Sequence, residues 1–420
     1  MMNTKTKIQL SVMMFLEFFV WGAWFVTMWR YLNRLNFDGT QIGAAYSTTG
    51  WAAIISPFFV GMIADRFFSA QKVMAVLHLL GALLMSWTAT ITEPILFFWV
   101  LLAYTVCYMP TLALSNSISF AQMTNPETEF PPIRVLGTIG WITAGLLVGF
   151  MPKGIFGLDT IEDTNIPMWI AAGASLLLAV YSLFLPNTPP KTTGQQIRVS
   201  DILGLKSLGL LKDRSFAVFI LCSLLICIPL SFYYQSANGF LGEIGLKNPA
   251  AKMTLGQVSE FFFMLMMPFL IARLGIKKMM LLAMGAWVLR YVFFAFGNTQ
   301  SMLTTSYLYL GILLHGICYD FFFVSGQIYV DKKAPSDIRA GAQGFIAFVT
   351  LGLGMIIGNL INGFITRRYS TSTHIDNLNA ITHNWQTIWL FPAAMAIAVF
   401  ILFALSFSDK ISAKNPTDGR

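Results

Sequence analysis

Five charged side chains lie inside long apolar runs of this 420-residue sequence: Glu17, Arg134, Glu260, Arg290 and Asp320. A charge in apolar surroundings is costly, so each of these residues is a candidate for ligand binding or proton transfer. An unpaired carboxylate such as Asp320, which three phenylalanines follow, holds a proton more readily than a carboxylate in water. A group that loads and releases a proton near neutral pH needs this property.

Polar and aromatic residues accompany these charges at helical spacing. Arg134, Thr138 and Trp141 lie at positions i, i+4 and i+7, which places a cation, a hydroxyl and a ring on one helical face. Gln257 and Glu260 are three residues apart and also share a face. The alternatives are an Arg134 that only ends its helix near the interface and a Gln257 and Glu260 pair that only joins helices.

Three further groups of residues complete the candidate site. The first contains an acid beside aromatic rings: His315, Tyr319 and Asp320. The second contains an acid with two tryptophans: Glu17, Trp21 and Trp24. The third contains hydroxyls and amides: Ser231, Tyr234, Gln235 and Asn238. The tryptophans could serve only as interface anchors, the amides could already lie in water, and Arg290 could simply pair with an acid or reach the outer interface.

The elements that position these residues must cross a membrane. The chain is 56% apolar and only 11% charged, which leaves too little polar surface for a water-soluble protein of this length. A membrane-spanning helix needs about 20 mainly apolar residues, and the sequence contains twelve such stretches. We therefore predict an all-α membrane protein with helices near residues 8–31, 41–65, 71–90, 94–122, 132–151, 165–187, 214–242, 250–274, 277–297, 301–330, 337–366 and 383–408.

The longest polar stretch, at 188–213, indicates a cytoplasmic linker between two six-helix bundles, at 1–187 and 214–420. The segments FPPIRVLGTIGW and APSDIRAGAQGF occupy matching places in the two bundles, which indicates a pseudo-symmetric internal repeat. Lys and Arg gather in alternate loops, and this distribution predicts that both termini lie in the cytoplasm. The net charge of +8 is therefore a topology signal, and nucleic acid is not expected as a partner.

Metal and redox chemistry have little support in the sequence. The four cysteines, Cys107, Cys222, Cys227 and Cys318, lie in apolar runs without the spacing of metal ligands. A membrane-embedded enzyme would need a carboxylate-rich metal motif or a histidine cluster, and the sequence contains neither. We expect no cofactor, no metal and no enzymatic activity.

The segment GMIADRFFSAQK resembles the loop signature of the major facilitator superfamily, with Gly61, Asp65, Arg66 and Lys72. An ordinary charged turn is the alternative. Further segments in matching order resemble the bacterial nucleoside:proton symporter family of that superfamily: FDGTQIGAAYS, FPPIRVLGTIGW, GQVSE, YDFF, IRAGAQG and NWQTIWLF. The resemblance implies a monomer in the bacterial inner membrane that imports nucleosides together with protons. The alternative is a major facilitator porter for a sugar or a drug.

The resemblance also implies roles for individual residues. Glu17, Glu260 and Asp320 would couple protons. The sequence departs from the family at Trp141, where a phenylalanine is expected, and at Glu17, where a neutral amide is expected, so the base preference stays open. The implied substrate-binding residues are Arg134, Thr138, Trp141, Ser231, Tyr234, Gln235, Gln257, Glu260, His315, Tyr319 and Asp320.

Overall fold

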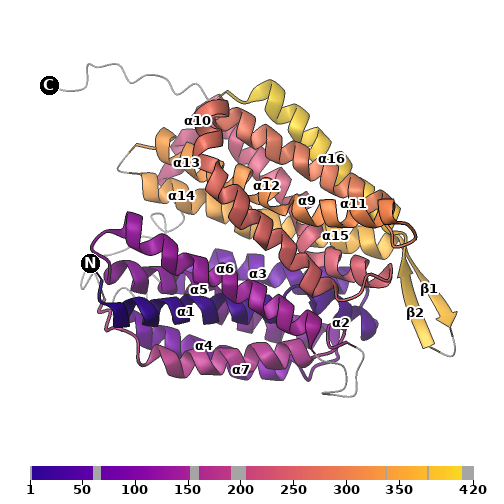
Figure 1. Cartoon of the computed structure of the whole chain (residues 1–420), viewed down its shortest axis with the longest axis horizontal. Coiled ribbons are helices and arrows are strands. Elements are labelled where there is room, and N and C mark those ends of the chain that lie inside the picture. Colours follow the sequence, from indigo (N-terminus) through magenta and orange to yellow (C-terminus); the bar gives the residue numbers. More distant parts are fainter. Residues whose placement is uncertain are drawn as a thin grey trace.

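The computed structural model describes residues 2–59, 68–151, 160–190, 205–335, 338–375 and 378–408, and these are nearly all helical. The helices form two groups that lie side by side (Figure 1), here called the N-half and the C-half. The N-half contains α1 (Thr4–Trp24), α2 (Met28–Arg34), α3 (Gly39–Phe59), α4 (Ala70–Thr88), α5 (Pro94–Ala121), α6 (Pro126–Phe150) and α7 (Ile166–Ser182).

The C-half follows a short 3-10 helix, η2 (Leu205–Lys212). The predicted division at 188–213 thus lies between α7 and the next long helix, although residues 191–204 are outside the described part of the chain. The C-half contains α9 (Arg214–Glu243), α10 (Pro249–Phe296), α11 (Met302–Leu313), α12 (His315–Tyr319), η3 (Asp320–Val324), α13 (Ser325–Lys333), α14 (Arg339–Ala347), η4 (Phe348–Gly354), α15 (Met355–Arg368), β1 (Ser370–Ile375), β2 (Leu378–His383) and α16 (Trp385–Ser406).

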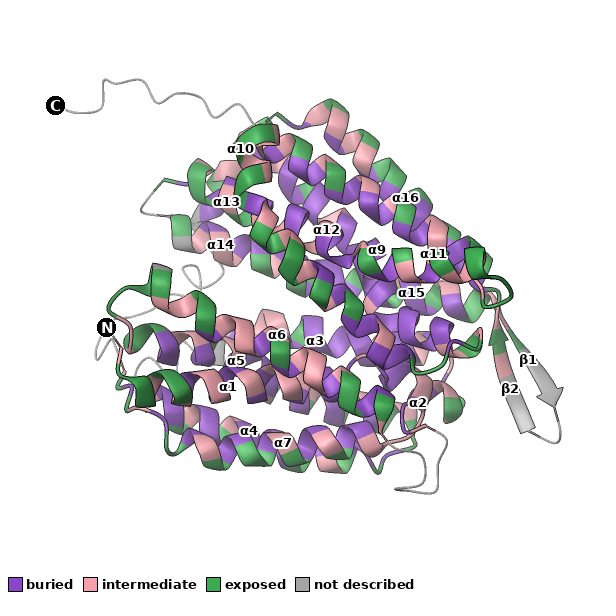
Figure 2. Cartoon of the chain, in the orientation of Figure 1, coloured by how far each residue is buried: buried purple, intermediate pink, exposed green. Residues whose placement is uncertain are grey.

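Nine helical segments of the described chain are long and apolar enough to cross a membrane, and Ile166–Ser182 is a shorter apolar helix. Large apolar side chains are exposed on the outer faces, such as Leu177 and Val180 on α7 and Leu265 on α10. Buried residues gather where helices pack together (Figure 2). Apolar side chains outside and packed helices inside are what a lipid environment requires. The count of twelve spans and the side on which the termini lie stay predictions.

Local sequence explains where several helices begin. The side chains of Asn3, Glu93 and Asp213 accept hydrogen bonds from the first free N–H groups of α1, α5 and α9. Gly275, with φ 76° and ψ 167°, divides α10 into two helical segments, because only glycine adopts this backbone conformation without strain. The division agrees with the predicted boundary between the spans at 250–274 and 277–297.

The two ends of the molecule differ. At the termini end, α1 begins and α16 ends, whereas β1 and β2 project from the opposite, hairpin end (Figure 1). The antiparallel pair, with Ser370 opposite His383, departs from the all-α prediction. Its segments, STSTHI and LNAITH, are too short and too polar to form a membrane helix, and their β-branched residues favour strands.

Candidate functional site

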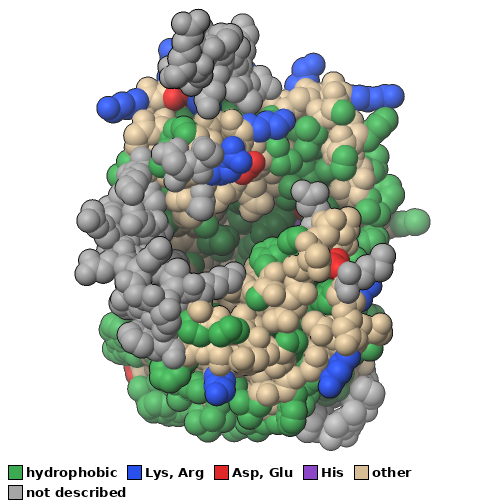
Figure 3. All heavy atoms as spheres, turned by 90° about the vertical axis from the view of Figure 1, so that its left-hand side faces the viewer, with side chains coloured by type: hydrophobic (Ala, Val, Ile, Leu, Met, Phe, Trp, Pro, Cys, Tyr) green, Lys and Arg blue, Asp and Glu red, His purple; other side chains and the backbone are tan. Residues whose placement is uncertain are grey.

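A cavity of about 330 Å³ lies between the two halves. Its volume is at the lower end of the range of about 300–1,000 Å³ that is typical of small-ligand sites. The view onto the termini end shows a hollow between the halves with hydrophobic side chains inside it (Figure 3). Lining residues come from α1, α3, α5 and α6 on one side and from α9, α10, α12, η3, η4 and α15 on the other.

The predicted stripe on α6 lines this cavity with all three of its residues, Arg134, Thr138 and Trp141. The Arg134 guanidinium lies over the Phe18 ring, 4.2 Å from its centroid. The Trp141 ring packs edge-on against Trp21 of α1, with 5.4 Å between centroids. The N-half therefore presents a cation at one end of an aromatic wall.

The close packing of α6 on α1 depends on Gly140. A methyl group at this position would collide with the carbonyl oxygen of Phe15. Without a side chain at Gly140, the helices approach closely enough for Trp21 and Trp141 to meet, as small residues allow in membrane proteins.

Gln257, Glu260, His315 and Tyr319 line the opposite wall. Gly316 allows this arrangement, because a Cβ there would lie 2.6 Å from the backbone nitrogen of Glu260. Its N–H donates to Ser259 Oγ at 3.1 Å, which ties α12 to α10. As a result, the Nε2 atom of His315 lies 3.9 Å from Oε2 of Glu260, too far for a hydrogen bond.

Of the three predicted substrate-binding residues on α9, Ser231, Tyr234 and Gln235, only Tyr234 lines the cavity. Ser231 is buried, donates to the Ile228 carbonyl and packs against Gly358 of α15. Gln235 is also fully buried, and neither atom of its amide has a hydrogen-bond partner in the described part of the chain.

Asp320 follows Tyr319 at the start of the π-helical turn η3 and is fully buried behind the cavity wall. Neither carboxylate oxygen has a hydrogen-bond partner among the residues that the structure describes. A π-helical turn inside an α-helical span often occurs at a functional position. Asp320 thus adjoins the cavity without lining it.

Glu17 also lies outside the cavity lining, on the face of α1 that packs inside the N-half. Its Oε2 atom is 2.9 Å from His78 Nε2, and its Oε1 atom accepts a hydrogen bond of 2.6 Å from Thr111. The other ring nitrogen of His78 lies 3.0 Å from Ser175 Oγ. Of the predicted stripe with Trp21 and Trp24, only Trp21 reaches the cavity.

The loop signature can be placed only in part. Gly61, Asp65 and Arg66 lie outside the described residues, and Lys72 is exposed on α4. The structure also shows lining residues that the sequence reasoning did not identify. These are mainly aliphatic and aromatic residues with a few polar groups: Phe18, Phe25, Thr49, Ala53, Met109, Leu112, Asn116, Cys227, Leu230, Phe323, Thr350, Leu351 and Met355.

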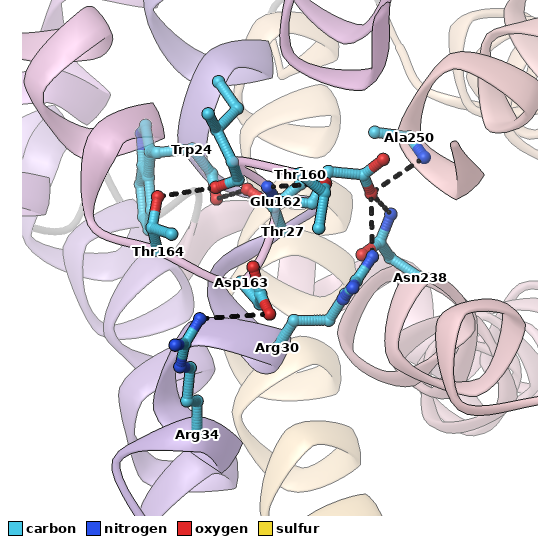
Figure 4. A network of polar contacts seen from close by, with 11 residues as sticks. Trp24, Thr27, Arg30, Arg34, Thr160, Glu162, Asp163, Thr164, Asn238 and Ala250 are labelled. Atoms are coloured by element: carbon cyan, nitrogen blue, oxygen red, sulfur yellow. Dashed lines mark hydrogen bonds and ion pairs between the residues drawn. The ribbon is translucent and has the colours of Figure 1, made fainter. Parts of the chain in front are cut away.

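At the hairpin end, Glu162 connects the two halves (Figure 4). This residue precedes α7 in the N-half, and its Oε2 atom accepts hydrogen bonds from Asn238 Nδ2 at 3.0 Å and from the Ala250 N–H at 3.1 Å, both in the C-half. Arg30 of α2 lies 3.4 Å from the same oxygen. Burial raises the pKa of Glu162, while Arg30 and these donors act in the opposite direction.

A cavity that is polar at a few points and aromatic elsewhere, between two groups of membrane helices, defines a membrane transporter. Within the described chain, no three His, Cys, Asp or Glu residues are grouped so that they could hold a metal ion.

Comparisons with known proteins give the family. The family model described as "Nucleoside H+ symporter" matches residues 2–412. The chain is 49% identical over 96% of its length to YegT of Escherichia coli strain K12, whose name proposes a nucleoside transporter and of which 94% is covered. It is 34% identical to the nucleoside permease NupG of the same organism, with 96% of each chain covered.

A crystal structure of the nucleoside transporter NupG matches with a TM-score of 0.84 and 33% identity, over 95% of this chain and 98% of that one. The chain therefore belongs to the nucleoside:proton symporter family, and its structure has the fold of that transporter. The family resemblance predicted from the sequence is confirmed.

Proposed function

We propose that this protein imports nucleosides together with protons across the bacterial inner membrane, by alternating access of the central cavity. The observation that carries the proposal is the cavity itself, to which the two halves contribute a cation, a carboxylate, amide groups and aromatic rings. Aromatic faces can stack on a flat base, and Glu260 and Gln257 can bind sugar hydroxyls. The names of the relatives support nucleosides over other solutes with rings and hydroxyls.

If both termini are cytoplasmic, the cavity opens towards the cytoplasm and the protein is in an inward-facing conformation. The halves are joined at the hairpin end through Glu162, and the hollow faces the termini end. A second cavity of about 20 Å³, which Ala250 lines, shares Trp141, Tyr234 and Gln257 with the central one. This small space marks the route to the outside, which rocking of the two six-helix bundles would open. One chain holds the whole site, so a monomer in the lipid bilayer suffices.

Protons would enter through the acids of the C-half. Glu260 lines the cavity and can meet both ligand and solvent, whereas Asp320 is buried directly behind the cavity wall. Arg134 faces Glu260 across the cavity and would draw it into its ionised form as the halves move, which would release a proton inward. Glu17 is the weaker proton-coupling candidate, because His78 and Thr111 already bind its carboxylate.

The test is uptake of labelled uridine and adenosine into proteoliposomes with an imposed proton gradient. Glu260→Gln and Asp320→Asn should weaken gradient-driven accumulation while the protein still inserts into the membrane. Glu243→Gln, which changes an acid at the hairpin end outside the cavity, is the matched control. Full accumulation by both variants would refute the assignment of these two acids. Preferential competition by sugars or drugs would favour the other porter classes.

A further inference from the structure

Arg290 is a fully buried cation that does not line the cavity. It lies on the second segment of α10, and it forms no ion pair with the described residues. Instead, its guanidinium lies 3.5 Å from the ring centroid of Tyr233, and its Nε atom donates to the Gly311 carbonyl at 2.9 Å. Its third neighbour is a titratable side chain of the cavity wall, because Nη2 lies 3.0 Å from Nδ1 of His315.

This contact determines the proton position on His315. A guanidinium can only donate hydrogen bonds, so Nδ1 of His315 must be the acceptor and must carry a lone pair. The imidazole is then neutral, and its single proton is on Nε2. The opposite tautomer, or an imidazolium, would direct an N–H group against the Arg290 donor.

The protonated Nε2 atom is also the ring nitrogen nearest to Glu260. At a separation of 3.9 Å, the Nε2 proton and the Glu260 carboxylate oxygen do not form a hydrogen bond with each other. A donor and an acceptor that face the same point match a hydroxyl group, because a hydroxyl can accept from one and donate to the other.

We propose that Arg290 is a positioning residue that holds His315 as the neutral Nε2–H tautomer, so that His315 and Glu260 together bind one hydroxyl group of the transported solute. The identity of that solute as a nucleoside rests on the proposed function. The tautomer does not, because it follows from contacts within the protein. The two parts are therefore tested separately.

The tautomer is measured by NMR on the purified full-length protein with ¹⁵N-labelled histidine, without any ligand. The sequence has four histidines, and the spectrum of His315→Phe identifies the signal of His315. We expect a protonated Nε2 and an unprotonated Nδ1 in the unmodified protein, and a mixture of tautomers in Arg290→Met. A protonated Nδ1 at His315 in the unmodified protein would overturn the inference, and this measurement needs no Arg290 variant.

The role in binding is measured with uridine and its 2′-, 3′- and 5′-deoxy analogues. One analogue should bind the unmodified protein about tenfold or more weakly, the size expected when buried polar groups lose their partner. That preference should disappear in His315→Phe and in Arg290→Met. The double variant should bind uridine no more weakly than His315→Phe alone, because Arg290 acts through His315.

Arg273→Met is the matched control, since Arg273 also lies on α10 and stacks on a ring, that of Phe269, outside the cavity. It should leave the preference unchanged. An Arg290→Met change that weakens binding equally in the His315→Phe background would show a merely structural role and refute the proposal. If uridine does not bind at all but the tautomer is as expected, the proposed function fails and the Arg290 and His315 assignment stands.

Discussion

Removal of the Glu162 side chain should open the hairpin end of the transporter. In Glu162→Ala, the Asn238 amide and the Ala250 N–H of the C-half lose the carboxylate that joins them to the N-half. Hydrogen bonds to a charged group contribute about 1.5–3 kcal/mol each, so the gross loss is about 3–6 kcal/mol. Burial raises the pKa of Glu162, so desolvation outweighs the help that the ionised carboxylate receives from its donors, and the net loss is smaller than this gross figure. We expect a net shift of about 2 kcal/mol, or roughly thirtyfold, towards the outward-open state.

The assay is the distance between spin labels at Thr92→Cys and Ser301→Cys, in a chain whose four native cysteines are replaced by alanine. Both positions are exposed, one in each half, next to helix ends at the hairpin end. Glu162→Ala should populate a longer distance. Asp163→Ala is the matched control, because Asp163 pairs with Arg34 within the N-half. An unchanged distance distribution in Glu162→Ala would refute the reasoning.

The same labels test the pH dependence of this contact. In the open state Glu162 meets water and has its ordinary pKa near 4.5, whereas burial raises its pKa in the closed state. Between these two values the closed state binds more protons, so acidification should favour closure and a rise in pH should favour opening. Glu162→Gln cannot titrate and should remove this pH dependence. A pH effect of equal size in that variant would assign it to another group.

Three other perturbations follow from the packing. Trp141→Ala should weaken nucleoside binding by about 1–3 kcal/mol, the usual contribution of base stacking. Trp169→Ala, on the exposed face of α7, should leave binding unchanged. Equal binding by both variants would exclude stacking on Trp141. Glu17→Gln should lower the thermal unfolding midpoint by weakening the His78 contact but leave the KM of uptake unchanged; a large rise in KM would return Glu17 to the substrate site. Gly149→Leu should lengthen the distance between the spin labels at the hairpin end, because a side chain there meets Ala251 of the C-half. Gly173→Leu should not, since Gly173 has open space around it. No change in Gly149→Leu would mean that α6 and α10 can separate without opening the route to the outside.

Periodicity within a helix predicted which residues of α6 share a face, but it did not predict which neighbouring elements each face contacts. Arg134, Thr138 and Trp141 share a face by spacing, and all three line the cavity. However, spacing does not determine which neighbouring helix a given face contacts. Glu17 meets His78, which is 61 residues away in the sequence, and only the tertiary packing of the N-half brings these two side chains together.

The polar stretch of α9 shows the same limit. Ser231, Tyr234 and Gln235 lie at positions i, i+3 and i+4, so spacing alone allows all three to share a face, yet only Tyr234 lines the cavity. The sequence offers no reason to select Tyr234, because the choice depends on the contact of Ser231 with Gly358 of α15. Similarly, Glu162 lies in a loop where an acidic residue is unremarkable, and only the approach of α9 and α10 makes it a contact between the halves.

The five intramembrane charges are accommodated in different ways, and the difference bears on coupling. Glu17 has His78 and Thr111, and Arg290 has a ring, a carbonyl and a histidine lone pair, so both have partners within their own half. Arg134 and Glu260 face the cavity, where ligand and solvent can reach them. Asp320 alone of the five is buried with both side-chain oxygens unpartnered in the described chain. A proton is the smallest partner that can neutralise such a group. Asp320 is therefore the strongest candidate, on physical grounds, for binding the proton that this family couples to transport.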